Sequence, residues 1–404
     1  MNQFISQFTR HRDFACVTVA DLVARSAYQM GKTPLLPIFA ATLGATGAFL
    51  GLIVSVSTVT GMVLKPLIGI LSDRWGRRVW LLLGTAFFAV MPFLYQFIQT
   101  PKQLLAIRLM HGIATAIYGP VTVAFVAEQT HRRRAERLGW FSMARSGGYI
   151  LGPAIAGALL LVMEPVQVFT IIGLLSSVVF IPVLLLPEVV PSRKKHRPSF
   201  LHQIQESLKA GGRTPAVWLS GGLNATMFIA LYAIKAFLPV QALELGMNVA
   251  LVGLFFSVQE GVHMILRPWG GHLGDYRGYL TAIALGMALL GITLSLLALP
   301  QTGLTLLSLA GLMGVAQALV FPSSVALVVT QISPQYLGAG IGLVGTLDNF
   351  GKVIGPVLGG LLIQRFEFGQ SIQMLGFMVL LAAALVWTWK QRSKRVKNFR
   401  GDGD

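Results

Sequence analysis

Charged and titratable side chains recur inside long apolar stretches of this sequence, at spacings of three or four residues that place each group on one face of a helix. The groups are Asp21, Arg25, Tyr28 and Lys32; Glu260, His263 and Arg267; and Asp348 and Lys352. Burial favours the protonated form of a carboxylate and a nearby cation favours the charged form, so such a group can bind and release a proton. Asp21, Glu260 and Asp348 are therefore candidates for proton coupling, and Glu260 is favoured because its helical neighbour His263 also titrates. Alternatively, Asp21–Arg25, Asp348–Lys352 and Glu260–His263 are structural pairs.

Cations outnumber carboxylates within these apolar stretches. Ionisable residues inside such segments usually face a cavity or one another. A cavity with a net positive charge favours an anionic or zwitterionic solute. The candidate residues of this substrate cavity are Arg25, Tyr28, Lys32, Arg145, Tyr149, Lys235 and Lys352.

The elements that carry these side chains are predicted to be membrane-spanning helices. Of the 404 residues, 54% are hydrophobic and only 12% are charged, and apolar stretches of about 20 residues, long enough to cross a bilayer, recur throughout. Helices are expected because every backbone polar group in lipid must be bonded internally. We predict an all-α membrane protein with twelve transmembrane helices, at residues 14–42, 48–71, 79–98, 104–127, 139–162, 167–187, 215–241, 250–270, 280–299, 304–327, 339–362 and 371–389.

The basic residues predict the orientation of these helices. The net charge of +17 is spread over short segments between the spans and forms no basic domain, so nucleic-acid binding is not expected. If both termini are on the cytoplasmic side, the predicted outer loops carry only two basic residues, Lys102 and Arg365. Cytoplasmic loops are enriched in lysine and arginine. We therefore predict an integral, multi-pass protein of the plasma (inner) membrane, with both termini cytoplasmic.

The sequence also repeats itself, with a shift of 202 or 203 residues. Prolines and glycines of four predicted helices coincide in the two copies, which is improbable by chance. Each copy has six spans, an even number, so the copies share one orientation, and such parallel repeats form two bundles with a solute path between them. The predicted domains are a six-helix bundle at 1–187, a cytoplasmic linker at 188–214, and a second bundle with a basic cytoplasmic tail at 215–404.

The loop between the second and third spans reads Gly69-Ile-Leu-Ser-Asp73-Arg74-Trp-Gly76-Arg77-Arg78. Its glycines permit a tight turn, and its aspartate can pair with arginine or accept backbone N–H groups. The run resembles the signature loop of the major facilitator superfamily, which steadies the cytoplasmically closed state. The resemblance implies a cytoplasmic gate at Gly69, Asp73, Arg74, Gly76, Arg77 and Arg78. The second copy keeps Asp275 but changes the order of the following residues, which implies a weaker latch.

Two further segments strengthen this resemblance. Leu104, Arg108 and His111-Gly112 resemble the motif that places an arginine inside the fourth helix of proton-coupled members, with His111 in place of the usual glutamine. The resemblance implies that Arg108 takes part in proton coupling. The alternative is that Arg108 extends to the outer membrane interface.

The fifth span resembles a glycine–proline motif of the antiporter, drug-exporting branch, with Ala156 as its one departure. The eleventh span repeats the motif without departure. The resemblance favours export as the direction of transport, and helix packing alone is the alternative reading. The predicted helix-kink residues are Gly148, Gly152, Pro153, Gly157, Gly351, Gly355 and Pro356.

Together these features predict a secondary active transporter that works by alternating access and couples proton movement to the export of small amphipathic organic molecules. The alternative is a transporter of organic anions or metabolites, such as carboxylates or siderophore-like compounds, and a non-transporting receptor is more distant. Motifs of hydrolases and nucleotide-binding enzymes are not found, so we expect no enzyme, cofactor or bound metal. The expected partners are a small-molecule solute, protons and the lipid bilayer, and the expected state is a monomer.

Overall fold

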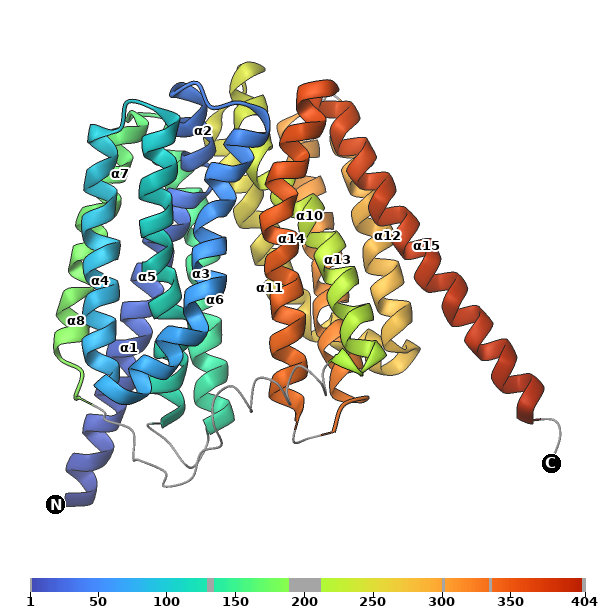
Figure 1. Cartoon of the computed structure of the whole chain (residues 1–404), viewed down its shortest axis with the longest axis horizontal. Coiled ribbons are helices and arrows are strands. Elements are labelled where there is room, and N and C mark those ends of the chain that lie inside the picture. The colour runs from blue at the N-terminus through green and yellow to red at the C-terminus, as the bar shows by residue number, and fades with distance from the viewer. Residues whose placement is uncertain (1, 129–133, 189–211, 300–301, 334–335, 402–404) are drawn as a thin grey trace. The chain divides into compact units, whose positions relative to one another are not determined.

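The computed structural model describes residues 2–128, 134–188, 212–299, 302–333 and 336–401, which are helical almost throughout and include no strand (Figure 1). The elements are α1 (Asn2–Lys32), α2 (Leu35–Thr42), α3 (Gly47–Trp75), α4 (Arg77–Phe93), the 3-10 turn η1 (Leu94–Phe97), α5 (Pro101–Glu128), α6 (Arg134–Leu159), α7 (Pro165–Val178), α8 (Phe180–Leu184), α10 (Pro215–Glu244), α11 (Val249–Arg277), α12 (Tyr279–Leu297), α13 (Gly303–Val329), α14 (Leu337–Arg365) and α15 (Phe368–Gly401). With α2, η1 and α8 counted as continuations of the helices before them, twelve helical segments follow the order of the predicted spans. The all-α prediction is confirmed.

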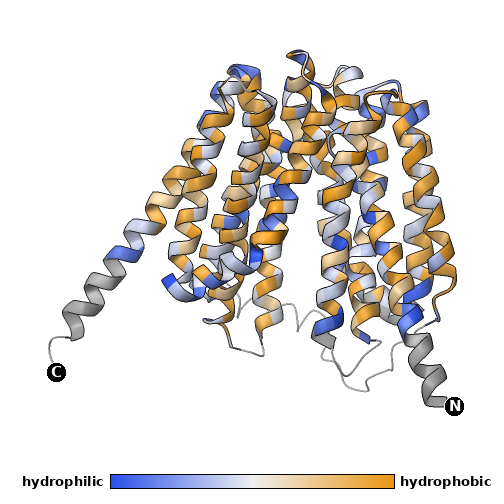
Figure 2. Cartoon of the chain, turned by 180° about the vertical axis from the view of Figure 1, so that it is seen from behind, coloured by the Kyte–Doolittle hydropathy of each residue, from blue (hydrophilic) through white to orange (hydrophobic). Residues whose placement is uncertain are grey.

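Nine helical segments of the described residues are long and apolar enough to cross a membrane. The three long segments outside this set are α1, α6 and α14, and these carry Asp21, Arg145 and Lys352 among their charged residues. Figure 2 shows apolar colour along most of each helix, with hydrophilic residues towards the helix ends and at scattered points within. The candidate charges on α1, α6 and α14 therefore also lower the hydropathy of those three helices.

Some helix boundaries differ from the predicted spans. The first predicted span is divided, because α1 ends at Lys32 and α2 begins only at Leu35. Pro34 lies at this break, and proline has no N–H with which to continue a helical hydrogen-bond ladder. Most of the predicted linker, at 189–211, and the side chains of the basic tail from residue 392 lie outside the described residues.

The chain divides into two compact units. Unit 1 contains Met1–Lys194 and Lys235–Ser257, and unit 2 contains Lys195–Ile234 and Val258–Asp404. Within unit 1 the start of α11 packs closely on α6: the Ser257 hydroxyl donates to the carbonyl of Ile150 at 2.6 Å. A Cβ placed on Gly253 would lie only 2.3 Å from the carbonyl oxygen of Pro153. These contacts explain why the sequence Lys235–Ser257 groups with the first copy of the repeat.

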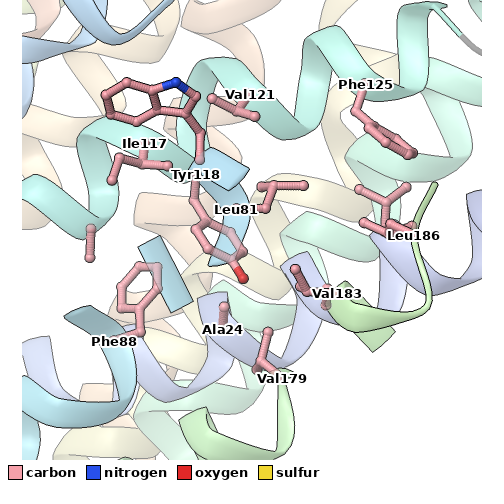
Figure 3. Packing of buried hydrophobic residues seen from close by; sticks show 14 of the residues in the cluster. Ala24, Leu81, Phe88, Ile117, Tyr118, Val121, Phe125, Val179, Val183 and Leu186 are labelled. Atoms are coloured by element: carbon pink, nitrogen blue, oxygen red, sulfur yellow. The ribbon is translucent and has the colours of Figure 1, made fainter. Parts of the chain in front are cut away.

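An apolar core in unit 1 holds α1, α4, α5 and α8 together. Figure 3 shows Tyr118 of α5 among Leu81 and Phe88 of α4 and Val183 of α8, all of them buried. The Tyr118 hydroxyl bonds the hydroxyl of Thr85, so its polar atom is satisfied inside the core. This core fixes the helices whose polar side chains form the candidate site of unit 1.

The glycine–proline motifs are sites of close helix packing in both units. Gly148 and Gly152 of α6 face the backbone of α1, and Gly351 and Gly355 of α14 face the backbone of α10 in the same way. Each pair joins the fifth helix of one sequence copy to the first helix of that copy. The sequence repeat is thus also a repeat of helix packing, which small residues permit by letting backbones approach.

Replacing Gly152 or Gly355 with valine is expected to lower the melting temperature of the purified protein. The new Cβ would lie 2.9 Å from the carbonyl oxygen of Ser26 or 2.4 Å from that of Ile229, and overpacking of this kind costs about 1–3 kcal/mol. Matched controls are Gly139→Val and Gly342→Val, on the same two helices, where no atom lies within 4 Å of the new Cβ. An equal loss in the controls would assign the effect to valine's helix propensity instead.

Candidate functional site

Asp21 of α1 lies at the centre of a buried charge cluster in unit 1. Its side chain is 1% exposed, and Arg145 of α6 donates to both of its oxygens at 2.9 Å. Arg25 lies farther away, at 3.6 Å, and the Thr122 hydroxyl of α5 lies at 3.2 Å. The sequence predicted the pair with Arg25 from its spacing, but the closer partner comes from another helix. The cluster holds one carboxylate between two guanidinium groups.

The motif glycines make room for this cluster. A Cβ on Gly148 would lie 2.9 Å from Cγ of Arg25 and 3.0 Å from the backbone nitrogen of Ser26, so only glycine lets α6 approach α1 here. The guanidinium of Arg25 then lies 5.8 Å above the ring of Tyr149. Arg25, Arg145 and Tyr149, three of the predicted cavity residues, are therefore neighbours in unit 1.

Arg108 of α5 is buried in a second cluster of unit 1, with an exposed fraction of 1%. Its guanidinium donates to Ser57 Oγ at 2.8 Å and to the Tyr95 hydroxyl at 3.4 Å. The Tyr28 hydroxyl lies 3.2 Å from the same Ser57 oxygen. Arg108 is therefore directed into unit 1, and the alternative that it extends to an interface is wrong.

The imidazole ring of His111 lies near Arg108, among several aromatic rings of unit 1. Its Nδ1 lies 3.5 Å from the Tyr95 hydroxyl, and its ring meets the rings of Tyr28 and Phe88 edge-on, at 5.5 and 5.9 Å. The described hydrogen bonds and ion pairs of Arg108 and His111 involve no carboxylate. The positive charge of Arg108 is thus surrounded by hydroxyl groups and aromatic rings.

Lys32 extends the positive charge of this second cluster. Its Nζ lies 5.8 Å from the ring centre of Tyr28, and Arg108, Lys235 and Lys65 lie close enough to repel it electrostatically. The predicted cavity residues Tyr28, Lys32 and Lys235 therefore belong together within unit 1. A group of four cations at this spot would attract an anionic group.

Unit 2 contains a third cluster, built by α10, α11, α13 and α14. Glu260 Oε2 lies 3.6 Å from His263 Nδ1, and the His263 ring lies 5.3 Å from that of Phe321. Phe321 lies 5.0 Å from Phe228, and Lys352 Nζ lies 4.2 Å from the ring centre of Phe228. The predicted proton-coupling pair and the predicted cavity residue Lys352 are thus joined by two aromatic rings.

Asp348 lies beside this third cluster on α14, one turn before Lys352. It is hydrogen-bonded by the Asn224 side chain of α10 and lies within electrostatic range of Lys352. The close approach of α14 to α10 at Gly351 makes this contact possible, because a Cβ there would lie 2.4 Å from the carbonyl oxygen of Ala225. Asp348 therefore has a partner on another helix as well as the lysine that the spacing predicted.

The predicted cytoplasmic gate is anchored mainly by Arg77. Its guanidinium donates to both oxygens of Glu128 at 2.6 and 3.2 Å and to Ser72 Oγ at 2.7 Å, and Arg78 donates to the carbonyl of Leu184 at 2.6 Å. Gly76 has φ of +89°, and a Cβ there would lie 1.8 Å from a carboxylate oxygen of Glu188. The loop is thus tied to α5 and to the end of α8.

The other predicted gate residues differ in their surroundings. The Gly69 carbonyl accepts from the Ser72 hydroxyl. The side chains of Asp73 and Arg74 lie outside the described part of the chain. Asp275, their counterpart in the second copy, is exposed and bonded by the Tyr279 hydroxyl. Pro153 and Pro356 lie inside α6 and α14, as predicted.

Several residues of these clusters were not predicted from the sequence. They are uncharged or lie at helix ends, namely Ser57, Tyr95, Thr122, Glu128, Asn224, Phe228 and Phe321. Two signals were available. Asn224 and Phe228 are four residues apart, so they share a face of α10, and Glu128 stands four residues before the run Arg132-Arg133-Arg134. The hydroxyl groups and Phe321 carried no comparable signal among so many similar residues.

Comparison with known families gives a match over nearly the whole chain. The sequence profile of the Major Facilitator Superfamily matches residues 23–240 and 218–402, so both copies of the repeat are matched separately. Multidrug resistance protein MdtG of Serratia proteamaculans is 27% identical over 374 residues, covering 89% of each chain. Quinolone resistance protein NorA of Staphylococcus aureus is 24% identical over 374 residues, covering 90% of this chain and 93% of NorA.

Solved structures share the fold. The nucleoside transporter NupG superposes with a TM-score of 0.78 at 14% identity, covering 93% of this chain and 98% of NupG. A bacterial homolog of the human lysosomal transporter Spinster gives a TM-score of 0.73 at 15% identity, covering 95% and 96% of the two chains. At these identities the likeness concerns the fold alone.

Proposed function

Because this chain belongs to the major facilitator superfamily, and is thus a multi-pass membrane transporter, we propose that it couples proton movement to the export of small amphipathic organic molecules by alternating access. It acts as a monomer in the plasma (inner) membrane, with both termini cytoplasmic. Its bundles at 1–187 and 215–404 are joined by a linker at 188–214, and it has no enzymatic activity. The contact that carries the proposal is the Glu260–His263 pair beside two aromatic rings.

Proton coupling requires a titratable group whose surroundings change during transport. Glu260 and His263 have side chains that are 18% and 17% exposed, so they are reachable without being fully solvated. A proton shared by this pair neutralises the carboxylate, and its release restores a negative charge beside apolar rings. Asp21 is less suited to this role, because two guanidinium groups already hold it in the charged form. Arg108 contributes as a fixed positive charge in unit 1.

Export is favoured by the relatives and by the glycine–proline motif. MdtG and NorA carry names that describe resistance to drugs or quinolones, which is the expected consequence of export. The motif that resembles the exporting branch is present in both copies, on α6 and α14. Aromatic rings beside charged groups in unit 2 suit solutes with both apolar and polar parts.

An organic anion is the second candidate solute, favoured by the cations around Lys32. Four cationic side chains lie near one another in unit 1, and such a group lowers the energy of a carboxylate or phosphate. Under this alternative, Arg25, Lys32 and Lys352 are each required for anion transport. Anion transport that is retained in each of the three single glutamine variants would contradict it.

Transport by the purified protein in liposomes tests the proposal. With an imposed pH gradient, addition of a transported solute should increase proton movement, and a protonophore should abolish solute accumulation. A panel of cationic, zwitterionic and anionic amphiphiles would identify the solute. Proton movement that no solute of the panel changes would contradict the coupling, and an absence of any solute flux would favour a non-transporting receptor.

A further inference from the structure

Exposed tryptophans gather towards one end of unit 2. Successive long helices run in opposite directions (Figure 1), so the start of α10, the end of α11, the start of α12 and the last turns of α15 lie at the same end. All four tryptophans of unit 2 lie towards this end and are between 41% and 64% exposed, namely Trp218, Trp269, Trp387 and Trp389. Exposed tryptophan near the end of a span is typical of the boundary between lipid and water.

Positive charge gathers at the same end. Among the described residues of unit 2, the charged side chains there are Arg213, Arg277 and Lys390, together with the carboxylate of Asp275. At the opposite end of the unit, the charges of Arg365 and Glu367 cancel. Beyond Gln391, α15 continues to Gly401 through a sequence with five further basic residues and no acidic one. One end of unit 2 therefore has a net positive charge that the other end lacks.

Lys390 is fixed at the point where the end of α11 and the start of α12 meet α15. Its ammonium group donates to the hydroxyl of Thr281 and lies 5.1 Å from the ring centre of Trp387. The Thr281 hydroxyl in turn donates to the carbonyl of Arg277 at 2.8 Å. A Cβ on Gly291 of α12 would lie 2.8 Å from a backbone carbonyl oxygen of α15, so the two helices are closely packed. We call Arg277, Thr281, Trp387 and Lys390 the basic corner.

The basic corner lies at the depth where two candidate membrane spans end. The apolar segment of α12 begins at Tyr279 and that of α15 ends at Gln391, so Thr281 and Lys390 lie in the first and the last turn of their spans. Lipid headgroups lie at this level, just outside the hydrocarbon. Lysine and arginine there attract anionic lipids, and tryptophan prefers the same level. Charge, depth and side-chain type thus fit the headgroup of a phospholipid.

We infer that the basic corner binds an anionic phospholipid. Arg277 and Lys390 attract the phosphate, and Trp387 lies at the level of the glycerol. The acyl chains lie along the outer face of α15, where Leu381 and Leu385 are more than half exposed. The inference concerns the lipid around the transporter and not its solute, so it goes beyond the proposed function.

Fluorescence quenching by brominated lipids tests this inference. The purified full-length protein in detergent is titrated with phosphatidylglycerol or with phosphatidylcholine that carries the same brominated acyl chains. The difference between proteins with and without Trp387→Phe gives the signal of Trp387 alone. Phosphatidylglycerol should quench this signal at a concentration about 25-fold lower, because each of two cations contributes about a factor of five. The preference should vanish at about 1 M salt, which screens charges beyond about 3 Å.

Charge variants assign this preference to the basic corner. Lys390→Gln and Arg277→Gln should each lower the preference for phosphatidylglycerol about fivefold, and Lys390→Arg should retain it because the charge is kept. Arg365→Gln, at an exposed position on the opposite end of unit 2, is the matched control and should change nothing. Where Lys390→Gln lowers the melting temperature through its lost contact with Thr281, Arg277→Gln decides, because Arg277 is exposed.

Four results would overturn the inference. These are equal quenching of Trp387 by the two lipids, an unchanged preference in both Lys390→Gln and Arg277→Gln, an equal loss in Arg365→Gln, and displacement of phosphatidylglycerol by inorganic phosphate at the same concentration. The last result would assign the basic corner to a soluble anion. Quenching is measured without solute and without a pH gradient, so its outcome is independent of proton coupling and of the direction of transport.

Discussion

Replacing Asp21 with alanine is expected to destabilise unit 1 by about 3–5 kcal/mol, the usual cost of removing one partner of a buried ion pair. Asp21 is 1% exposed and receives two hydrogen bonds at 2.9 Å from Arg145, with Arg25 at 3.6 Å. Without the carboxylate, two guanidinium groups remain close together in a place with little water. Their mutual repulsion and incomplete solvation are the physical origin of the loss.

Thermal unfolding of the purified variants in detergent measures this effect. Asp13→Ala is the matched control on the same helix. Among the described residues Asp13 pairs with the half-exposed Arg12 at 3.3 Å, so its loss leaves a cation that water can solvate, and we expect a cost of at most about 1 kcal/mol. Adding Arg145→Gln to the Asp21 variant should restore part of the stability, since it removes one of the unpaired charges. Additive losses in the double variant would show that the two side chains are not energetically coupled.

The helices of this fold could be predicted from the sequence because a bilayer leaves few options. A long apolar run must form internal hydrogen bonds, so its existence and helical type follow directly, and paired glycines revealed the repeat. The boundaries were less certain: the break between Lys32 and Leu35 depends on the local geometry at Pro34. The charged residues within spans were also found readily, because they stand out from their surroundings.

The contacts between helices could not be predicted in the same way. Spacing shows which side chains share one helix face, as for Asp21 and Arg25, but not which face of another helix meets them. Arg145 therefore had no predicted partner, although it holds Asp21 more closely than Arg25 does. The spacing from Asn224 places Phe228 on one face of α10, but only the approach of α14 to α10 shows that Lys352 lies above its ring.

Replacing Glu260 with glutamine is expected to separate solute movement from proton movement. Glutamine keeps the size and hydrogen-bonding capacity of the side chain but cannot exchange a proton, so the pair with His263 at 3.6 Å loses its titratable carboxylate. Accumulation driven by a pH gradient should fall by about 5- to 150-fold, the scale of a typical coupling free energy of 1–3 kcal/mol. Exchange of labelled for unlabelled solute at saturating concentration should continue, because exchange requires no net proton transfer.

Both activities can be measured in one preparation of liposomes, which makes the comparison internal. Glu244→Gln is the matched control, since Glu244 is an exposed carboxylate at the end of α10, and it should retain gradient-driven accumulation and exchange alike. Gradient-driven accumulation that persists in Glu260→Gln would exclude Glu260 as the coupling carboxylate. In that event Asp348 becomes the next carboxylate to replace. Its neighbours Asn224 and Lys352 stabilise a charged carboxylate less than the two arginines beside Asp21 do.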